Sequence, residues 1–414
     1  MYQVTNFIDG KECLESNESI SIINPSYGID IGEVLYATKN SANNAVEAAA
    51  KSFKTWSKSG LSYRAELILK LRQGIIDRSD EIIKICISEA GKTRPDAEAE
   101  LDRAIQALTH TAGVQHFYPS IMSPNVAGGI DITDVRYPIG VVVGCGPFNF
   151  PILIPILHAS MAIVTGNTFI AKPSEKVPSI SRLYADIFKE SGFPDGCYNV
   201  LNGGKEIVEQ LVCHEKVAGL AFIGSTPVAK SLKILGVQNN TKIQALGGGK
   251  NHMIVLPDAD LDMAADAAVS ASFGAAGQRC MAGSLLVGVG DVKESLKEKV
   301  SGAIDKLIVG DPIKNEKTEM GPVIDSNSQE RISKIIEKVE KNGASLINDG
   351  RKLIDNDGYF IGPTLFDNVN PDMTVFSEEI FGPVLSILNP KNLTEAIQWL
   401  NKLNYGNGAT IFTT

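Results

Sequence analysis

The chain has 414 residues, of which 43% are hydrophobic and 21% charged, so it is expected to be a soluble globular protein of two or three domains. A net charge of −9 excludes the basic surface that a nucleic-acid partner would normally require. The six cysteines (13, 86, 145, 197, 213 and 280) contain no Cys-x-x-Cys pair and the five histidines show no metal-ligand spacing, so no metal is expected. Residues 1–10 lack a signal-peptide pattern, and we expect a reducing, cytoplasmic setting.

The predicted elements change character along the chain. An introductory segment is followed by helices over residues 42–56 and 63–78, where apolar residues recur at helical spacing. From residue 139, short apolar runs at 139–143, 168–171, 198–201 and 219–223 read as strands, most of them followed by a helix. A second block of this kind spans 251–385, with strands at 252–256 and 285–289. This alternation predicts parallel sheets covered on both faces, and the Gly- and Pro-bearing segment 119–135 predicts a protruding hairpin.

One stretch resembles a membrane span. Residues 138–166 contain no Asp, Glu, Lys or Arg. They contain four prolines, however, which would break a single continuous helix. We therefore expect a buried strand, a loop and a buried helix, and no membrane partner.

Three segments that follow strands are candidate nucleotide-binding turns. Residues 222–228 form a turn in which Gly224 leads to a helix, with Thr226 expected as N-cap and Pro227 in the first position, a suitable place for a phosphate. Residues 202–205 are a second turn of this kind, and neither is a G-x-G-x-x-G fingerprint. Lys172 and Glu175 end another strand, where they would hold ribose hydroxyls or form only an exposed ion pair.

Two side chains are candidates for the chemistry itself. Asn149 lies between aromatic residues and prolines, so its amide is either a fixed donor for an oxyanion or an ordinary turn residue. Cys280 is flanked by small residues that leave room for a substrate, and Arg279 beside it is expected to favour the thiolate. The alternative is a buried structural cysteine.

Six motifs then occur in one order: residues 147–151, 166–175, 222–225, 247–251, 277–280 and 379–383. With these motifs the chain resembles the aldehyde dehydrogenase superfamily over nearly its full length. The resemblance implies an α/β fold with two parallel or mixed-sheet Rossmann-like domains and a small oligomerisation hairpin. It assigns residues 1–118 and 136–246 to an NAD-binding domain, 119–135 to the hairpin and 247–414 to a catalytic domain.

The resemblance also implies roles for individual residues. Cys280 would be the nucleophile and Asn149 the oxyanion donor. The dinucleotide would be held by residues from several motifs: Phe148, Lys172, Glu175, Gly224, Ser225, Glu379 and Phe381. NAD is expected as cofactor, because an acidic Glu175 would repel the 2′-phosphate of NADP.

The most informative departure from the superfamily pattern concerns the base that activates water. Hydrolytic members carry a glutamate before Leu-Gly-Gly-Lys, whereas this chain has Leu246 or, by another anchoring, Ala245. The nearest alternative acid in sequence is Asp258. This absence resembles the methylmalonate-semialdehyde dehydrogenase branch, which transfers the acyl group to coenzyme A. In that branch two arginines are associated with the substrate carboxylate, and they fall on Arg279 and Arg103, although Arg103 also fits a solvated helix face.

Three functions therefore stay open at this point. The first is NAD-dependent oxidation of methylmalonate or malonate semialdehyde to an acyl-CoA. The second is a hydrolytic dehydrogenase for another small aldehyde, such as succinate semialdehyde or a sugar aldehyde. Because superfamily members continue for tens of residues beyond Thr414, the third is a truncated, non-catalytic chain with an incomplete C-terminus. A homodimer or homotetramer is expected for the full-length form.

Overall fold

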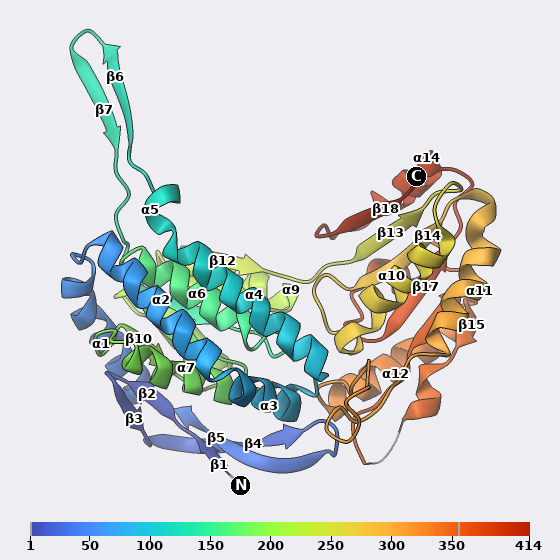
Figure 1. Ribbon diagram of the computed structural model, residues 1–414, viewed down its shortest axis with the longest axis horizontal. Helices are drawn as coiled ribbons and strands as arrows, with labels where there is room; N and C mark the ends of the chain where they lie inside the picture. The colour runs from blue at the N-terminus through green and yellow to red at the C-terminus, as the bar shows by residue number, and fades with distance from the viewer. Residues whose placement is uncertain (1, 355–356) are drawn as a thin grey trace. The chain divides into compact units, whose positions relative to one another are not determined.

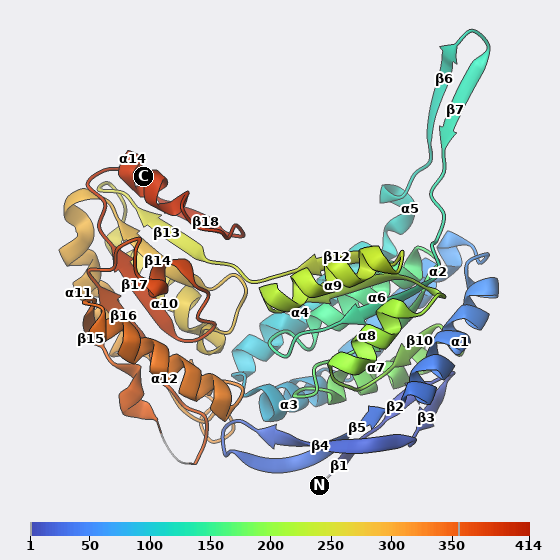
Figure 2. The ribbon, with the colours of Figure 1, turned by 180° about the vertical axis from the view of Figure 1, so that it is seen from behind.

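The computed structural model describes residues 2–354 and 357–414, which form two compact units (Figures 1 and 2). Unit 1 consists of residues 1–23, 30–86 and 98–247, and unit 2 of residues 24–29, 87–97 and 248–414. Each unit has its own sheet and its own hydrophobic core.

The helices are α1 (Lys39–Trp56), α2 (Leu61–Asp77), α3 (Ser79–Ala90), α4 (Arg94–Ala112), α5 (Val114–Phe117), α6 (Leu153–Val164), α7 (Ser179–Glu190), α8 (Lys205–Cys213), α9 (Thr226–Gln238), α10 (Leu261–Phe273), α11 (Lys293–Ile304), α12 (Ser326–Lys341), α13 (Thr374–Ser377) and α14 (Leu393–Leu400), with short 3-10 turns η1 (Gly274–Gly277), η2 (Gly290–Val292) and η3 (Gly350–Leu353). The strands are β1 (Tyr2–Val4), β2 (Asn6–Ile8), β3 (Lys11–Cys13), β4 (Ser16–Asn24), β5 (Ile29–Ala37), β6 (Ile121–Ala127), β7 (Ile130–Asp134), β8 (Val141–Cys145), β9 (Thr168–Lys172), β10 (Tyr198–Val200), β11 (Val217–Ile223), β12 (Lys242–Leu246), β13 (Asn251–Val255), β14 (Gly283–Gly288), β15 (Ser345–Asn348), β16 (Thr364–Asp367), β17 (Val384–Leu388) and β18 (Ala409–Phe412).

The main sheet of unit 1 has the strand order β12-β11-β8-β9-β10-β2-β3. The strands from β12 to β10 are parallel, and β2 and β3 add an antiparallel edge. Helices α1, α8 and α9 cover one face of this sheet, and α2, α6 and α7 lie on the other (Figures 1 and 2). Because both faces are covered, the central strands are apolar along their whole length, as in β8, where Val141, Val143 and Cys145 are buried.

The segment between α5 and β8 forms a β-hairpin made of β6 and β7 (Figure 1). Every residue of the two strands is exposed. Apolar side chains such as Ile121, Met122, Ile130 and Ile132 are among them. The hairpin expected over residues 119–135 is therefore present, and its role in oligomerisation stays a prediction.

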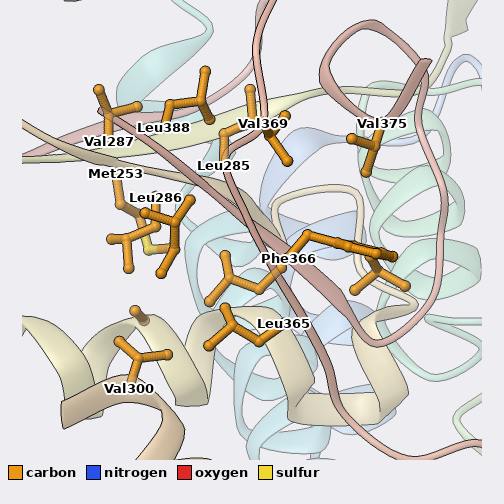
Figure 3. Close-up of a cluster of buried hydrophobic side chains, with 14 of the residues drawn as sticks. Met253, Leu285, Leu286, Val287, Val300, Leu365, Phe366, Val369, Val375 and Leu388 are labelled. Carbon is orange, nitrogen blue, oxygen red and sulfur yellow. The ribbon is translucent and has the colours of Figure 1, made fainter. Parts of the chain in front are cut away.

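Unit 2 contains a sheet of order β15-β16-β17-β14-β13-β18, in which only β15 pairs antiparallel. Its strands supply buried side chains to a large core, which Figure 3 shows around Met253, Leu285 and Phe366. Helices α10 and α11 pack on this sheet through apolar residues such as Val300. Removing these side chains from water is the main source of the unit's stability.

The predicted α/β class and strand positions are confirmed. Each of the six strands expected from the apolar runs is present within two residues of the predicted start, from β8 to β14. The uncharged stretch 138–166 forms β8, a turn and α6, as expected. The predicted N-cap of α9 is wrong by one residue: Ser225 occupies the cap position, and Thr226 is already helical.

Candidate active site

The predicted site residues fall on both units, and those of unit 1 begin with Asn149. This side chain is 7% exposed and lies in the turn between β8 and α6. The buried Glu100 carboxylate accepts the N–H groups of Ile152 and Leu153, both at 2.8 Å, and so satisfies two donors at the start of α6. The Tyr184 hydroxyl donates to the carbonyl of Ile152 at 2.8 Å. The turn that carries Asn149 is thus fixed by contacts from α4 and α7.

Lys172 and Glu175 lie at the carboxyl end of β9. Their charged groups are 3.6 Å apart, with the lysine side chain mostly buried and the glutamate side chain 36% exposed. The ion pair considered in the sequence is therefore formed. Such a pair does not exclude a cofactor role, because the Glu175 carboxylate remains accessible to a hydroxyl ligand.

The third strand end is that of β11, where Gly224 and Ser225 lead into α9. The N–H of Gly224 donates to the carbonyl of Leu246 at 3.1 Å, which ties the turn to β12. The side chain of the cap residue Ser225 makes no capping hydrogen bond in the part of the chain that the structure describes. Its backbone N–H groups, together with the positive end of the helix dipole, are suited to an anionic ligand such as a phosphate.

These three strand ends lie at one edge of the unit 1 sheet. The chain continues from β8 to β9 on one side of β8, whereas β11 lies on the other side. The carboxyl ends of β8 and β11 therefore flank the point at which the strand order reverses. Open parallel sheets bind nucleotides at such points, so the residues present fit a dinucleotide without a G-x-G-x-x-G motif.

The position of the missing base also lies at this edge. Leu246 is the last residue of β12 and is 51% exposed, and Ala245 is 6% exposed. Neither side chain can accept a proton. Asp258 lies beyond the far end of β13 from the Gly247–Gly249 turn, where it accepts hydrogen bonds from Thr413 and Thr414.

In unit 2, Cys280 follows a turn of unusual backbone conformation. Ala275, Ala276 and Gly277 have φ values of 50°, 53° and 69°, all in the left-handed region. For the two alanines this conformation costs about 1–2 kcal/mol each. Buried Gln278 holds the turn, because its amide donates to the carbonyl of Ala275 at 3.2 Å and its oxygen accepts the N–H of Ile324 at 2.9 Å.

Two asparagines fix the main chain at the nucleophile. The amides of Asn251 and Asn407 donate to the Cys280 carbonyl at 3.0 and 2.9 Å. The Asn251 amide also donates to Ala282 at 2.9 Å, and its oxygen accepts the N–H of Gly408 at 2.8 Å. The Cys280 backbone is therefore held from β13 and from the segment that precedes β18.

The expectation that Arg279 favours the Cys280 thiolate is wrong for this structure. Burial raises the pKa of the Cys280 thiol and the negative charge of Glu379 adds to this rise, although hydrogen bonds from the backbone of Cys280 and Met281 act to lower it. Arg279 is instead engaged in an ion pair with Asp96. The guanidinium that was expected to favour the thiolate is therefore already paired with a carboxylate.

Glu379 and Phe381 follow α13. The Glu379 carboxylate accepts the N–H of Gly249 at 3.1 Å and occupies the space in which a side chain at position 248 would lie. Burial raises the pKa of Glu379, whereas the Gly249 N–H and the charges of Lys250 and Arg331 lower it. Phe381 has a φ of 53°, a strained conformation for a non-glycine residue.

Arg103 lies on α4 in unit 1, is exposed, and donates to Gln106 one turn further on at 3.1 Å. The solvated helix face considered for it is thus the arrangement seen, and its role toward a substrate carboxylate stays a prediction. Over residues 2–354 and 357–414, no group of three or more potential metal ligands occurs. In the same residues no helix is both long and apolar enough to span a membrane.

The sequence model of the aldehyde dehydrogenase family matches residues 13–414. The chain belongs to the aldehyde dehydrogenase family. It is 39% identical over 414 residues to a malonate-semialdehyde dehydrogenase of Halalkalibacterium halodurans, covering 100% of this chain and 85% of the relative.

Two solved structures have the same fold as this aldehyde dehydrogenase. The methylmalonate-semialdehyde dehydrogenase of Oceanimonas doudoroffii superposes with a TM-score of 0.97 at 38% identity, covering 100% of this chain and 86% of that one. A proposed methylmalonate-semialdehyde dehydrogenase of Sinorhizobium meliloti 1021, in complex with NAD, also has a TM-score of 0.97 at 38% identity, with 100% and 85% covered.

Several residues that shape the site were not predicted. Asn251 lies within one of the six motifs, but the sequence gives no sign that it meets Asn407 at the Cys280 carbonyl, because Asn407 is 127 positions from Cys280. Asp96 and Glu100 were not singled out at all. A carboxylate on an amphipathic helix has no local signal that separates it from a solvated charge.

Proposed function

We propose that this aldehyde dehydrogenase oxidises methylmalonate or malonate semialdehyde with NAD and delivers the product as an acyl-CoA. The relatives whose names carry these substrates are 38–40% identical over nearly the whole chain. The substrates combine an aldehyde, which suits a cysteine nucleophile, with a carboxylate, which suits an arginine.

In the proposed reaction the Cys280 thiolate adds to the aldehyde carbon, and the carbonyl oxygen takes up the negative charge. The amide of Asn149 and the N–H of Cys280 stabilise this oxyanion, and Arg279 and Arg103 bind the carboxylate. When bound, NAD supplies the hydride acceptor. Cys280 then carries the acyl group as a thioester, the substrate carboxylate leaves as CO₂, and the thiol of coenzyme A displaces Cys280.

Residues from both units are proposed to hold NAD. The Gly224–Ser225 turn and the N-terminus of α9 would hold a phosphate, and Lys172 and Glu175 the hydroxyls of a ribose. Phe148, Glu379 and Phe381 would contact the remainder of the cofactor. We further assign residues 1–118 and 136–246 to NAD binding and residues 247–414 to catalysis.

The observation that carries the coenzyme A assignment is the side chain at position 246. An apolar leucine at the end of β12 cannot remove a proton from water, so a Cys280 thioester should hydrolyse slowly. A strong thiol nucleophile needs no such base. Coenzyme A is therefore the acceptor that this site supports best.

The test is product analysis with rapid-quench kinetics. Malonate or methylmalonate semialdehyde should give a burst of NADH of about one equivalent per site, followed by turnover only when coenzyme A is present. Mass spectrometry should identify an acyl-CoA. Equal steady-state rates with and without coenzyme A would contradict the proposal.

A hydrolytic reaction is the second candidate, and Glu379 is the observation that favours it. The carboxylate of Glu379 raises the pKa of the Cys280 thiol, so it lies close enough to affect the sulfur electrostatically. A carboxylate in that place could activate water for another small aldehyde, such as succinate semialdehyde or a sugar aldehyde. Release of free acid by the wild type would support this candidate if Glu379→Gln kept the NADH burst, and hence NAD binding, but lost the release of acid.

We also propose a homodimer or homotetramer in a cytoplasmic setting. The exposed apolar residues of the β6–β7 hairpin support self-association, because a two-stranded hairpin in water is only marginally stable alone. A free nucleophilic thiol such as that proposed for Cys280 is kept reduced in a cytoplasmic compartment. Light scattering of the chain, compared with a variant lacking residues 121–134, tests the association.

A further inference from the structure

Asp96, in the first turn of α4, contacts both ends of the turn that leads to Cys280. One carboxylate oxygen is paired with the Arg279 guanidinium, and the other accepts the N–H of Ala275 at 3.1 Å. Asp96 is mostly buried, with 15% of its side chain exposed, so water competes little with these bonds. A single carboxylate thus links residue 275 to residue 279.

The Arg279 guanidinium is held in a defined place but is not sealed off. It lies over Gly274, where an added Cβ would come to 2.6 Å from its nitrogen atoms, so a larger residue there would have to displace it. Its side chain is 31% exposed. A guanidinium has five N–H donors, and one carboxylate does not use them all. Arg279 can therefore donate hydrogen bonds to a second carboxylate, which would compete with Asp96.

We propose that Asp96 is the internal counter-ion of Arg279: it holds the guanidinium over Gly274, in the turn before Cys280, compensates its charge, and so sets how strongly carboxylate-bearing aldehydes are attracted. This inference rests on the proposed function, which assigns Arg279 to the substrate carboxylate. Asp96 acts through Arg279 and is therefore a positioning residue.

Alkylation of Cys280 tests the inference without any substrate. Iodoacetate carries a carboxylate and iodoacetamide is neutral, and both react with the same thiolate. The ratio of their rates at the Cys280 peptide therefore reports attraction of a carboxylate and cancels any change in the pKa of the thiol. Peptide mass spectrometry measures both rates in the full-length protein.

Asp96→Asn removes the charge but keeps an oxygen that can accept a hydrogen bond. We expect it to raise the iodoacetate-to-iodoacetamide ratio about three- to tenfold. Arg279→Gln should lower the ratio, and adding Asp96→Asn to Arg279→Gln should raise it again only in part, because the carboxylate that repels iodoacetate is then removed but the arginine that attracts it is still absent. The matched control is Asp349→Asn, which makes the same change in another Asp–Arg pair of unit 2 and should leave the ratio unaltered.

The outcomes separate this inference from the proposed function. If Asp96→Asn left the ratio unchanged, the role of Asp96 would be purely structural. If Asp96→Asn lowered the ratio, Asp96 would strengthen the attraction of a carboxylate by Arg279. Either result overturns the inference. A ratio unaffected by Arg279→Gln would instead overturn the carboxylate role of Arg279. With substrates, Asp96→Asn should lower the KM for malonate semialdehyde and not for propanal.

Discussion

At the scale of single residues, unit 2 contains a buried charged group that composition does not reveal. Lys250 is 2% exposed, and its ammonium has no hydrogen-bond partner among the described residues. Burial lowers the pKa of Lys250 to about 7, although the carboxylates of Glu379 and Glu378 act to raise it. A buried ammonium without a direct partner costs free energy, and this cost must depend on pH.

Lys250→Met should therefore stabilise the protein at low pH. The pKa of a lysine is about 10.4 when unfolded and about 7 here, so between these values the unfolded chain binds more protons and the stability of the wild type rises with pH. We expect the variant to gain about 2 kcal/mol below pH 7 and the gain to shrink toward pH 10. Urea unfolding at pH 6, 8 and 10 measures it.

The control for this measurement is Lys334→Met, which changes a lysine whose side chain is 70% exposed. It should alter stability little at any of the three pH values. The result that would contradict this account is a difference in the free energy of unfolding between Lys250→Met and wild type that is the same at pH 6 and pH 10. Lys250 would then have to be charged in the folded protein as well as in the unfolded chain at both pH values.

At the scale of elements, the turn before Cys280 depends on close backbone contacts. Gly277 has a φ of 69°, and a Cβ added there would lie 2.2 Å from the carbonyl oxygen of Gly382. Both the backbone conformation and the space therefore require glycine. In the sequence, the small residues here were interpreted as room for a substrate. The structure shows that Gly277 is needed because η1 packs against Gly382.

Gly277→Ala should destabilise unit 2 by more than about 2 kcal/mol and remove the NADH burst, because the backbone at Cys280 must shift. Gly302→Ala is the matched control. Gly302 lies inside α11, and among the described residues no atom outside its own turn of helix backbone lies within 4 Å of an added Cβ, so alanine there should stabilise the helix by about 0.5–1 kcal/mol. Urea midpoints of the two variants shifting in the same direction would contradict this account.

At the scale of the whole molecule, the part that could be predicted is the part with a local signal. Apolar runs predicted β8, β9 and β11, and the polar residues after them lie at one sheet edge because parallel strands share a direction. The Asp96–Arg279 pair joins residues 183 positions apart, and no local pattern records such a contact. The burial that raises the pKa of the Cys280 thiol also depends on the folded packing, so it was out of reach of sequence analysis.

The preference for NAD or NADP can be measured on the whole molecule, because a bound cofactor stabilises the folded state. NAD at a hundred times its Kd should add about 2.7 kcal/mol and raise the melting temperature. NADP should raise it less at equal concentration, because its 2′-phosphate would face the Glu175 carboxylate, and the net charge of −9 adds to the repulsion.

Glu175→Gln should bring the melting shifts with NAD and NADP closer together, chiefly by increasing that with NADP. Glu66→Gln is the control, because Glu66 also pairs with a lysine in unit 1, at 3.0 Å from Lys70 on α2. It should leave both shifts unchanged. If Glu175→Gln also left the difference between NAD and NADP unchanged, discrimination against the 2′-phosphate would have to come from the shape of the ribose site and not from charge.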